Sequence, residues 1–467
     1  MRNLTRYYGR YTGIFLILIL GLFIGVTSRK NSGIPLDNPS SVVQTLNSDD
    51  GTKSILETTN HRYETESNKE EFEISKPSSE SELLGNGKMT SSRQRSTGTT
   101  CESKNISSQK QAASSNKATS STTKPTTMPS AAPKTAEQYV DDLTLAEQVA
   151  QMFFARCPSS GAVEEIKRYA PGGYILFARD FENQTPSSIK KIIQGYQNAA
   201  SVPMLIGVDE EGGTVVRISK FPAFRSTPFS SPAEIYASGG TAALMRDSKE
   251  KDQLLKSLGI NVNLAPVCDV TTNPDDYMYR RTLGKEAKET AEGIKAIVNQ
   301  MTADRMGAVL KHFPGYGNNV DTHTGIAIDN RSLDSFRKND YLPFIAGIEA
   351  GAGGVLVNHN IINSMDASRP ATLSPAVHAI LRNELNFQGV IMTDDLSMSA
   401  ITKYTNGKNA AVSAVLAGND LLISSDFVNQ YRAVLAAAQE GIIPQTQIRS
   451  SVIRIIQWKI ELGLITL

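Results

Sequence analysis

The chain has 467 residues, of which 48 are Lys or Arg and 47 are Asp or Glu, so its formal net charge at pH 7 is +1. This balance and a pI of about 7.7 disfavour a dedicated nucleic-acid-binding protein, which usually presents a basic surface. Cys101, Cys157 and Cys268 show no CxxC spacing, which excludes a disulfide scaffold and a cysteine zinc site; Cys157 and Cys268 are expected to be buried apolar thiols.

Residues 1–30 combine positive charge with an apolar run. Three arginines precede the uncharged stretch from Ile14 to Val26, and Arg29 and Lys30 follow it. A cationic region before an apolar run is typical of a secretion signal, and the run is short for a membrane-spanning helix, which needs about 20 residues. We therefore expect either a cleaved signal peptide or an uncleaved signal anchor in or through the membrane. Either one places the rest of the chain outside the cytoplasm, secreted or anchored at a bacterial cell surface.

Residues 31–135 have the composition of a tether. Ser and Thr make up 20 of the 45 residues from Ser91 to Thr135, and apolar residues do not recur at a helical or strand period. Such a stretch cannot bury enough apolar area to offset the entropy of ordering, so we expect a disordered Ser/Thr-rich linker.

Residues 136–467 alternate short apolar runs with amphipathic stretches. Strands are predicted at 172–178, 203–209, 262–269, 307–313, 353–359, 389–395 and 419–425. Helices are predicted at 144–155, 187–197, 285–303, 333–350, 374–384, 409–417, 430–440 and 445–462. This alternation indicates βαβ units and a parallel sheet.

Seven or eight such units fit an α/β fold with a single (β/α)8 TIM-type barrel. Polar residues recur at the ends of the predicted strands, where such barrels carry their chemistry, which favours the barrel over an open doubly wound sheet. These residues are Asp209, Asp269, Lys311 with His312, Asn358 with His359, and Asp394 with Asp395.

Six ordered motifs make this region similar to a known family. They are DEEGGTVVR (209–217), NLAPVCD (263–269), RRTLG (280–284), KHFPGYG (311–317), DTH (321–323) and MTDDLSM (392–398). Residues 136–467 resemble the catalytic barrel of glycoside hydrolase family 3, and within it the NagZ-type β-N-acetylhexosaminidases. The resemblance does not extend to residues 1–135.

The resemblance implies which residues carry the reaction. A retaining glycosidase needs a carboxylate nucleophile and a proton donor that later acts as base. The family motif puts the nucleophile at Asp394 and leaves Asp395 as a helix cap. His323 is implied as the acid/base, paired with Asp321, and histidine suits that role because its ordinary pKa is near neutral.

The resemblance also implies sugar-binding residues, namely Asp209, Arg217, Arg281, Lys311 and His312. For the two arginines a salt bridge to a carboxylate such as Glu211 or Asp269 is the alternative role. Because side chains alternate along a strand, Lys311 and His312 are expected to face different sides. Gly212 and Gly213 are expected to form a sharp turn near the ligand.

The chain departs from the family pattern in the loop after KHFPG. Tyr316 stands where many relatives have a second histidine, and the proline often found after the DTH-type motif is missing. These differences bear on loop conformation and on preference for the leaving sugar. We expect no cofactor and no metal, because His312, Asp321 and His323 lack the HExxH-type spacing of a zinc site and the retaining mechanism requires none.

The sequence therefore predicts a monomeric, retaining β-N-acetylhexosaminidase that acts through a glycosyl-Asp394 intermediate. It would release terminal non-reducing N-acetylglucosamine from peptidoglycan fragments or other amino-sugar glycans. Three alternatives stay open: a β-glucosidase or β-xylosidase of the same family, an N-acetylglucosaminide phosphorylase, and a surface glycan-binding protein without activity. Sugar preference, a requirement for phosphate, and indifference to Asp394→Asn would distinguish them.

Overall fold

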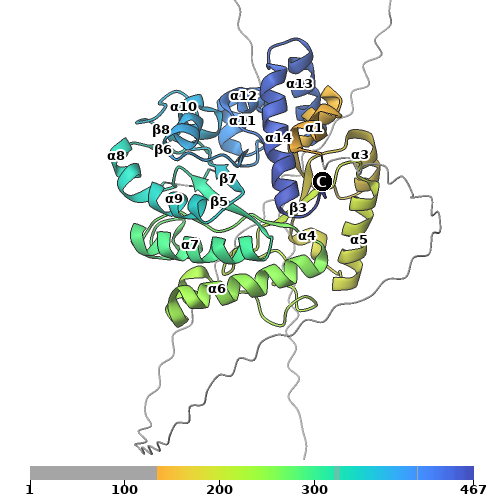
Figure 1. Ribbon diagram of the computed structural model, residues 1–467. Coiled ribbons are helices and arrows are strands. Elements are labelled where there is room, and N and C mark those ends of the chain that lie inside the picture. The colour runs from red at the N-terminus through yellow and green to blue at the C-terminus, as the bar shows by residue number, and fades with distance from the viewer. Residues whose placement is uncertain (1–133, 320, 323–324, 407–408, 467) are drawn as a thin grey trace, which may run out of the picture. The chain divides into compact units, whose positions relative to one another are not determined.

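The computed structural model describes residues 134–319, 321–322, 325–406 and 409–466 (Figure 1). The predicted signal segment, nearly all of the predicted linker, Cys101 and His323 lie outside these residues. Within the described part of the chain, no helix has the length and hydropathy to cross a membrane. The first helix, α1 (Ala136–Asp141), is capped by Thr135, whose side chain accepts a hydrogen bond from the Gln138 amide.

Eight parallel strands form a barrel. In the order in which they pair, the sheet runs β10-β1-β2-β3-β4-β5-β7-β9. A parallel bridge between Met392 and Leu421 joins its two outer strands, which brings the sheet round on itself. The strands are β1 (Phe153–Arg156), β2 (Gly173–Leu176), β3 (Leu205–Val208), β4 (Val262–Asn263), β5 (Gly307–Phe313), β7 (Gly354–Val357), β9 (Val390–Thr393) and β10 (Leu422–Ser424). The predicted (β/α)8 fold is confirmed.

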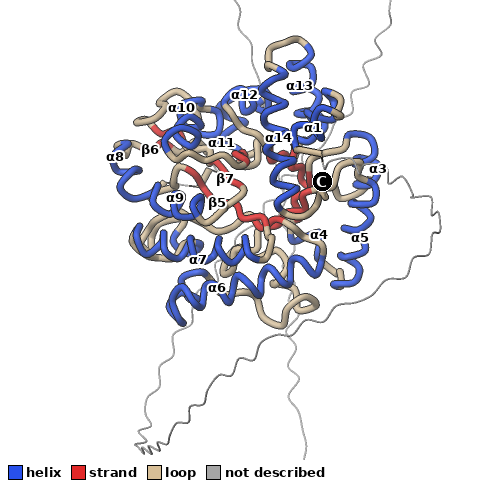
Figure 2. The backbone as a smooth tube through the Cα atoms, in the orientation of Figure 1, coloured by secondary structure: helices blue, strands red, loops and turns tan. Residues whose placement is uncertain are grey.

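Helices surround the strands (Figure 2). After α1 they are α2 (Leu145–Gln151), α3 (Ala162–Tyr169), α4 (Ala178–Phe181), α5 (Pro186–Ala199), α6 (Pro232–Leu258), α7 (Ala287–Ala303), α8 (Leu333–Ser335), α9 (Tyr341–Glu349), α10 (Pro375–Ala379), α11 (Ser399–Thr405), α12 (Ala410–Ala417), α13 (Phe427–Gln439) and α14 (Gln445–Glu461). Two π-helical turns, η2 (Phe336–Asp340) and η4 (Ile380–Glu384), continue α8 and α10. Short 3-10 turns lie at η1 (Tyr279–Arg281) and η3 (Ala371–Leu373), and a small parallel sheet pairs β6 (Ile328–Asp329) with β8 (Ile361–Ile362).

All seven predicted strands are present, but the eighth was assigned wrongly. The predicted helix 144–155 ends at Gln151, and Phe153–Arg156 is strand β1. Phe153, Phe154 and Ala155 are completely buried, and a short apolar run buried on both faces has no period that separates strand from helix. Helix α6 was not predicted; it is interrupted at Gly239 and Gly240, where the backbone leaves the helical region.

Aromatic packing supports the end of β5, the strand that carries two predicted site residues. The Phe313 ring lies edge-on to Phe344 of α9 at 5.2 Å and stacks on Tyr341 at 5.7 Å, measured between ring centroids. All three side chains are buried, and full burial of one such ring stabilises the fold by about 1.5–3 kcal/mol. The carboxyl end of β5 is therefore held from outside the barrel, and Lys311 and His312 project from that end. The peptide bonds before Pro266, His312 and Pro314 are cis.

Candidate active site

The chain after β3 turns sharply at the rim of the barrel. The buried Glu210 carboxylate accepts hydrogen bonds from the amides of Arg217 (2.9 Å) and Ile218 (2.8 Å), which ties the far end of the turn to its start. At Gly212 the φ angle is +98°, and a Cβ there would lie 2.3 Å from the Ser230 carbonyl oxygen. Gly213 also has a positive φ, of 63°, so the predicted glycine turn is confirmed.

A buried charge network lies beside this turn. Lys311 Nζ is 2.6 Å from Asp209 Oδ1 and 2.6 Å from Glu211 Oε1. Arg281 makes a bidentate pair with the same Glu211, with Nη2 2.7 Å from Oε1 and Nε 2.9 Å from Oε2. Burial alone would raise the Glu211 pKa, but the charges and hydrogen bonds of Arg281 and Lys311 outweigh it and hold that pKa well below its usual range. The alternative role considered for Arg281, a salt bridge to Glu211, is therefore present.

His312 belongs to the same network. Its Nδ1 lies 2.8 Å from Asp269 Oδ2 and its Nε2 lies 3.2 Å from Arg281 Nη2. Because a guanidinium can only donate, Nε2 is the acceptor and the proton lies on Nδ1, donated to Asp269. Lys311 and His312 thus reach one cluster, and the prediction that they face different sides is wrong. The pairing of β5 with β7 shifts register between Leu310 and Phe313, so simple alternation fails there.

Arg217 lies apart from this network. Its guanidinium is 5.9 Å from the centre of the Phe177 ring, which follows β2. Its Nε is buried, and the Nε–H finds no acceptor among the residues that the structure describes. A buried donor without an acceptor is costly, so a ligand oxygen at this point would relieve that cost.

Asp394 and Asp395 follow β9 and have different surroundings. The Asp394 amide donates to the Val357 carbonyl (3.2 Å), and its Oδ1 accepts from the Asp395 amide (2.8 Å). Asp395 Oδ1 accepts from the amides of Ser397 (2.9 Å) and Ser425 (3.2 Å). Asp395 therefore stabilises the turn before α11 and the end of β10, whereas the N-cap residue of α11 is Met398. The prediction that Asp395 caps the next helix was wrong, because α11 begins only at Ser399.

Asp321 is half-buried on the loop after β5. Burial and the negative charges of Asp321 and Asp394 raise the pKa of Tyr277 to about 12, against a lowering by Arg281. The charges of Asp321, Asp394 and Arg281 therefore all act on the Tyr277 hydroxyl. The predicted partner of Asp321, His323, lies outside the described residues.

The sequence offered Glu211 and Asp269 only as alternative salt-bridge partners of the arginines, and it gave Tyr277 no role. Glu211 fixes Arg281 and Asp269 fixes His312. The three successive carboxylates at 209–211 could have indicated this network, because carboxylates buried beside a barrel strand need cations or hydrogen-bond donors nearby. Tyr277 carried no such signal, since its role depends on a loop more than forty positions further along the chain.

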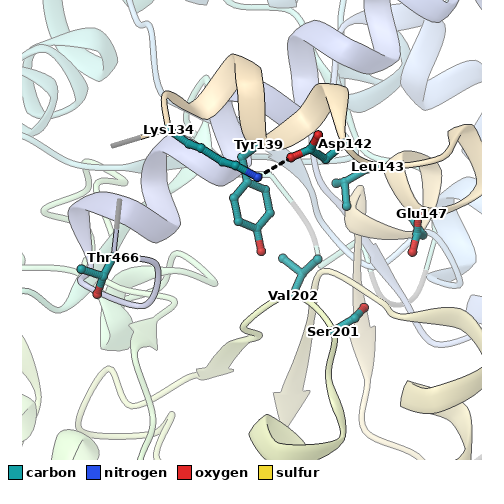
Figure 3. A pocket seen from close by; sticks show the side chains of 8 residues that line it. All are labelled: Lys134, Tyr139, Asp142, Leu143, Glu147, Ser201, Val202 and Thr466. Atoms are coloured by element: carbon teal, nitrogen blue, oxygen red, sulfur yellow. Dashed lines mark hydrogen bonds and ion pairs between the residues drawn. The ribbon is translucent and has the colours of Figure 1, made fainter. Parts of the chain in front are cut away.

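A separate pocket of about 340 Å³ lies near the N-terminal end of the described chain (Figure 3). Its lining comes from α1, from the residues around α2, from the segment before β3 and from the C-terminal residues, and includes Lys134, Tyr139, Asp142, Leu143, Glu147, Ser201, Val202 and Thr466. These segments precede β1 and β3, so the pocket lies at the amino ends of the strands. In barrels of this kind that face serves stability, and the chemistry lies at the carboxyl ends.

The comparisons with known proteins agree with this geometry. Residues 144–458 match the glycosyl hydrolase family 3 N terminal domain. The chain belongs to glycosyl hydrolase family 3. The family resemblance seen in its motifs is therefore confirmed.

Relatives of known name lie within this family. The chain is 33% identical over 327 residues to "Beta-hexosaminidase A" of Pseudoalteromonas piscicida, covering 64% of this chain and 55% of that protein. It is 34% identical over 260 residues to "Beta-hexosaminidase" of Nitrosomonas eutropha, covering 55% of this chain and 74% of that protein. The chain thus spans about half the length of the first relative and about three quarters of the second.

Solved structures give the same result. A glycoside hydrolase family 3 β-N-acetylglucosaminidase from a Paenibacillus species superposes with a TM-score of 0.64 at 30% identity, covering 70% of this chain and 65% of that one. A β-N-acetylhexosaminidase from Beutenbergia cavernae gives a TM-score of 0.61 at 26% identity, covering 68% and 98% of the two chains.

Proposed function

We propose that this chain is a retaining β-N-acetylhexosaminidase that releases terminal N-acetylglucosamine from amino-sugar glycans, peptidoglycan fragments among them. One observation carries the proposal: Asp394 follows β9 at the carboxyl end of the barrel, the same end at which Lys311 and Arg281 form a buried cationic cluster. A retaining glycosidase needs such a carboxylate beside the bound sugar, together with a proton donor. The names of the relatives support the choice of sugar.

In this mechanism Asp394 attacks the anomeric carbon of the sugar. The bond from that carbon to the leaving oxygen breaks, and the leaving oxygen takes a proton from His323, which Asp321 orients. Water, deprotonated by the same histidine, then attacks the glycosyl-Asp394 ester, releases the sugar and restores the Asp394 carboxylate. Asp395 does not compete as nucleophile, because its Oδ1 accepts from the Ser397 and Ser425 amides and its Oδ2 accepts from the Ser425 hydroxyl.

The cationic network would bind the sugar in the subsite next to Asp394. Glu211 already fixes Lys311 and Arg281, and Asp269 already fixes His312. Sugar binding would therefore cost little further conformational entropy in these three side chains. Asp209 can accept from hydroxyl groups while it contacts Lys311, since a carboxylate offers about four acceptor positions. Arg217 would donate its buried Nε–H to an oxygen of the sugar.

Release of 4-nitrophenol from the β-glycosides of N-acetylglucosamine, glucose and xylose by the full chain tests the proposal. We expect a preference for the N-acetyl sugar in kcat/KM, and loss of about 10³-fold or more in the Asp394→Asn variant, since the nucleophile's role cannot be replaced. His323→Ala is expected to lower the rate as well. Asp142→Asn is the matched control, because Asp142 pairs with Lys134 at the other end of the barrel. Preference for glucose or xylose would refute the choice of sugar.

We propose in addition that the barrel acts outside the cytoplasm, on the basis of the charge and apolar pattern of residues 1–30. Protease digestion of intact cells that express the full chain with a C-terminal tag tests this. Loss of the tagged barrel without cell lysis is expected, and its protection until lysis would contradict export.

A further inference from the structure

Two tyrosines from different loops stack beside the candidate site. Tyr277 precedes η1 in the loop after β4, and Tyr316 lies in the loop after β5; their ring centroids are 5.9 Å apart. The Tyr316 ring also meets the His312 ring edge-on at 5.6 Å, and its amide donates to Asp269 Oδ1 at 2.7 Å. Tyr316 is therefore fixed by the network that holds His312. Tyr316 is 3% exposed and Tyr277 is 39% exposed, so the pair extends from the buried network to the surface of the rim.

The two hydroxyls lie beside consecutive residues of one loop. Tyr316 Oη lies 2.5 Å from Thr322 Oγ1 and accepts from the Thr322 amide at 3.2 Å. The Thr322 side chain and backbone are thus joined to one phenol, and Thr322 is completely buried. The negative charge of the Asp321 carboxylate acts on the Tyr277 hydroxyl and raises its pKa.

We propose that Tyr277 and Tyr316 are positioning residues that together hold Asp321 where it must lie for proton transfer to the leaving sugar. This inference rests on the proposed function, in which Asp321 orients the acid/base. Tyr316 fixes the backbone next to Asp321 through Thr322, and Tyr277 packs on the Tyr316 ring with its hydroxyl toward the Asp321 carboxylate. A donor acts only within hydrogen-bond reach of its target, and a displacement of about 1 Å can cost about 10²-fold in rate.

The Tyr316 side chain is long enough for its hydroxyl to contact a residue six positions along the chain. Phenylalanine in place of either tyrosine keeps the ring stacking and removes only the hydroxyl. The effect of the two hydroxyls on Asp321 can therefore be measured apart from the packing of the rings.

The test compares two substrates that differ in their need for a proton. 4-Nitrophenolate is a good leaving group and departs with little protonation, whereas the sugar hydroxyl that leaves N,N′-diacetylchitobiose must be protonated. We expect Tyr277→Phe to lower kcat/KM for the disaccharide about tenfold, a part of the 10²–10⁴-fold that general acid catalysis supplies, and to lower kcat/KM for the 4-nitrophenyl glycoside by less than about threefold. The same direction is expected for Tyr316→Phe.

Tyr139→Phe is the matched control, because Tyr139 lies on α1 in the pocket at the other end of the barrel (Figure 3). It should leave both values of kcat/KM unchanged. Equal losses on the two substrates, or no loss with Tyr277→Phe, would overturn the positioning role. If Tyr316→Phe fails to fold, Tyr277→Phe still decides, since that ring lies at the surface. An unmutated chain that cleaves neither substrate would refute the proposed function instead.

Discussion

Replacing Glu211 with Gln removes a negative charge that two buried cations contact, while keeping the shape of the side chain. Glu211 is 1% exposed at its side chain, Lys311 is 3% exposed and Arg281 is 16% exposed, so water can replace little of the lost interaction. Breaking a buried ion pair from one side typically costs about 3–5 kcal/mol. Asp209 stays in contact with Lys311 at 2.6 Å, which places the expected loss at the lower end, about 3 kcal/mol.

That loss translates into a measurable shift of Tm. For a folded part of roughly 330 residues the entropy of unfolding is about 0.7 kcal/mol/K, so a loss of about 3 kcal/mol lowers Tm by about 4 °C. The Glu211 pKa is depressed in the folded chain, so its contribution is fully present above the pKa of the unfolded chain, near 4.5, and is lost as the pH falls toward the folded pKa. The difference in Tm between the two chains should be constant from pH 5 to 7 and shrink below pH 4.5.

Differential scanning calorimetry of the unmutated chain and Glu211→Gln at pH 7 and pH 4 makes the measurement. Glu147→Gln serves as a control, because the Glu147 side chain completes the capping box of α2 by accepting a hydrogen bond from the amide of the N-cap residue, Thr144. A Glu211→Gln variant as stable as the unmutated chain at pH 7, or a difference that grows as the pH falls, would refute the reasoning. Equal stability at pH 7 would mean that removing these three charged side chains from water costs about as much free energy as their pairing contributes.

Two further predictions concern other parts of the fold. Burial and the charge of the neighbouring Asp304 raise the pKa of Asp252 to about 8, so the unmutated chain should lose stability as the pH rises from about 4 to 8. Asp252→Asn should therefore raise Tm at pH 8 and by less at pH 5, as measured by circular dichroism, and a lower Tm for the variant at pH 8 would contradict this. At Gly315 the φ angle is +124° and a Cβ would lie 2.3 Å from Asp340 Oδ1, so Gly315→Ala should shift the loop that leads to Asp321. Its kcat/KM for N,N′-diacetylchitobiose should fall about tenfold or more, by the cost of misplacing a catalytic group, and an unchanged value would show that the loop tolerates the shift.

The sequence predicted the barrel because its strands are short, apolar and bounded by polar residues. Seven of the eight strands were recognised in this way. Strand β1 was not, since Phe153, Phe154 and Ala155 follow α2 with only Met152 between them and carry no turn residue. A local pattern cannot report that the first strand of a barrel must also pair with β10, which lies at the far end of the chain.

The site was predictable where a residue ends a strand and uncertain where two distant residues meet. Lys311, His312 and Asp394 were placed correctly at the ends of β5 and β9. The pairs Arg281 with Glu211 and Tyr277 with Asp321 join loops far apart in the sequence, and only the closed barrel brings them together. The roles of the catalytic and sugar-binding residues, the export of the barrel and its monomeric state remain predictions.

The central claim is that Asp394 becomes covalently bound to the sugar. Incubation of the full chain with a 5-fluoro derivative of β-N-acetylglucosaminyl fluoride, which slows the second step of a retaining mechanism, followed by peptide mass spectrometry, tests it directly. We expect one added sugar, on the peptide that contains Asp394, and no addition in Asp394→Asn. A label on Asp395 or on any other residue, or turnover without a covalent intermediate, would contradict it.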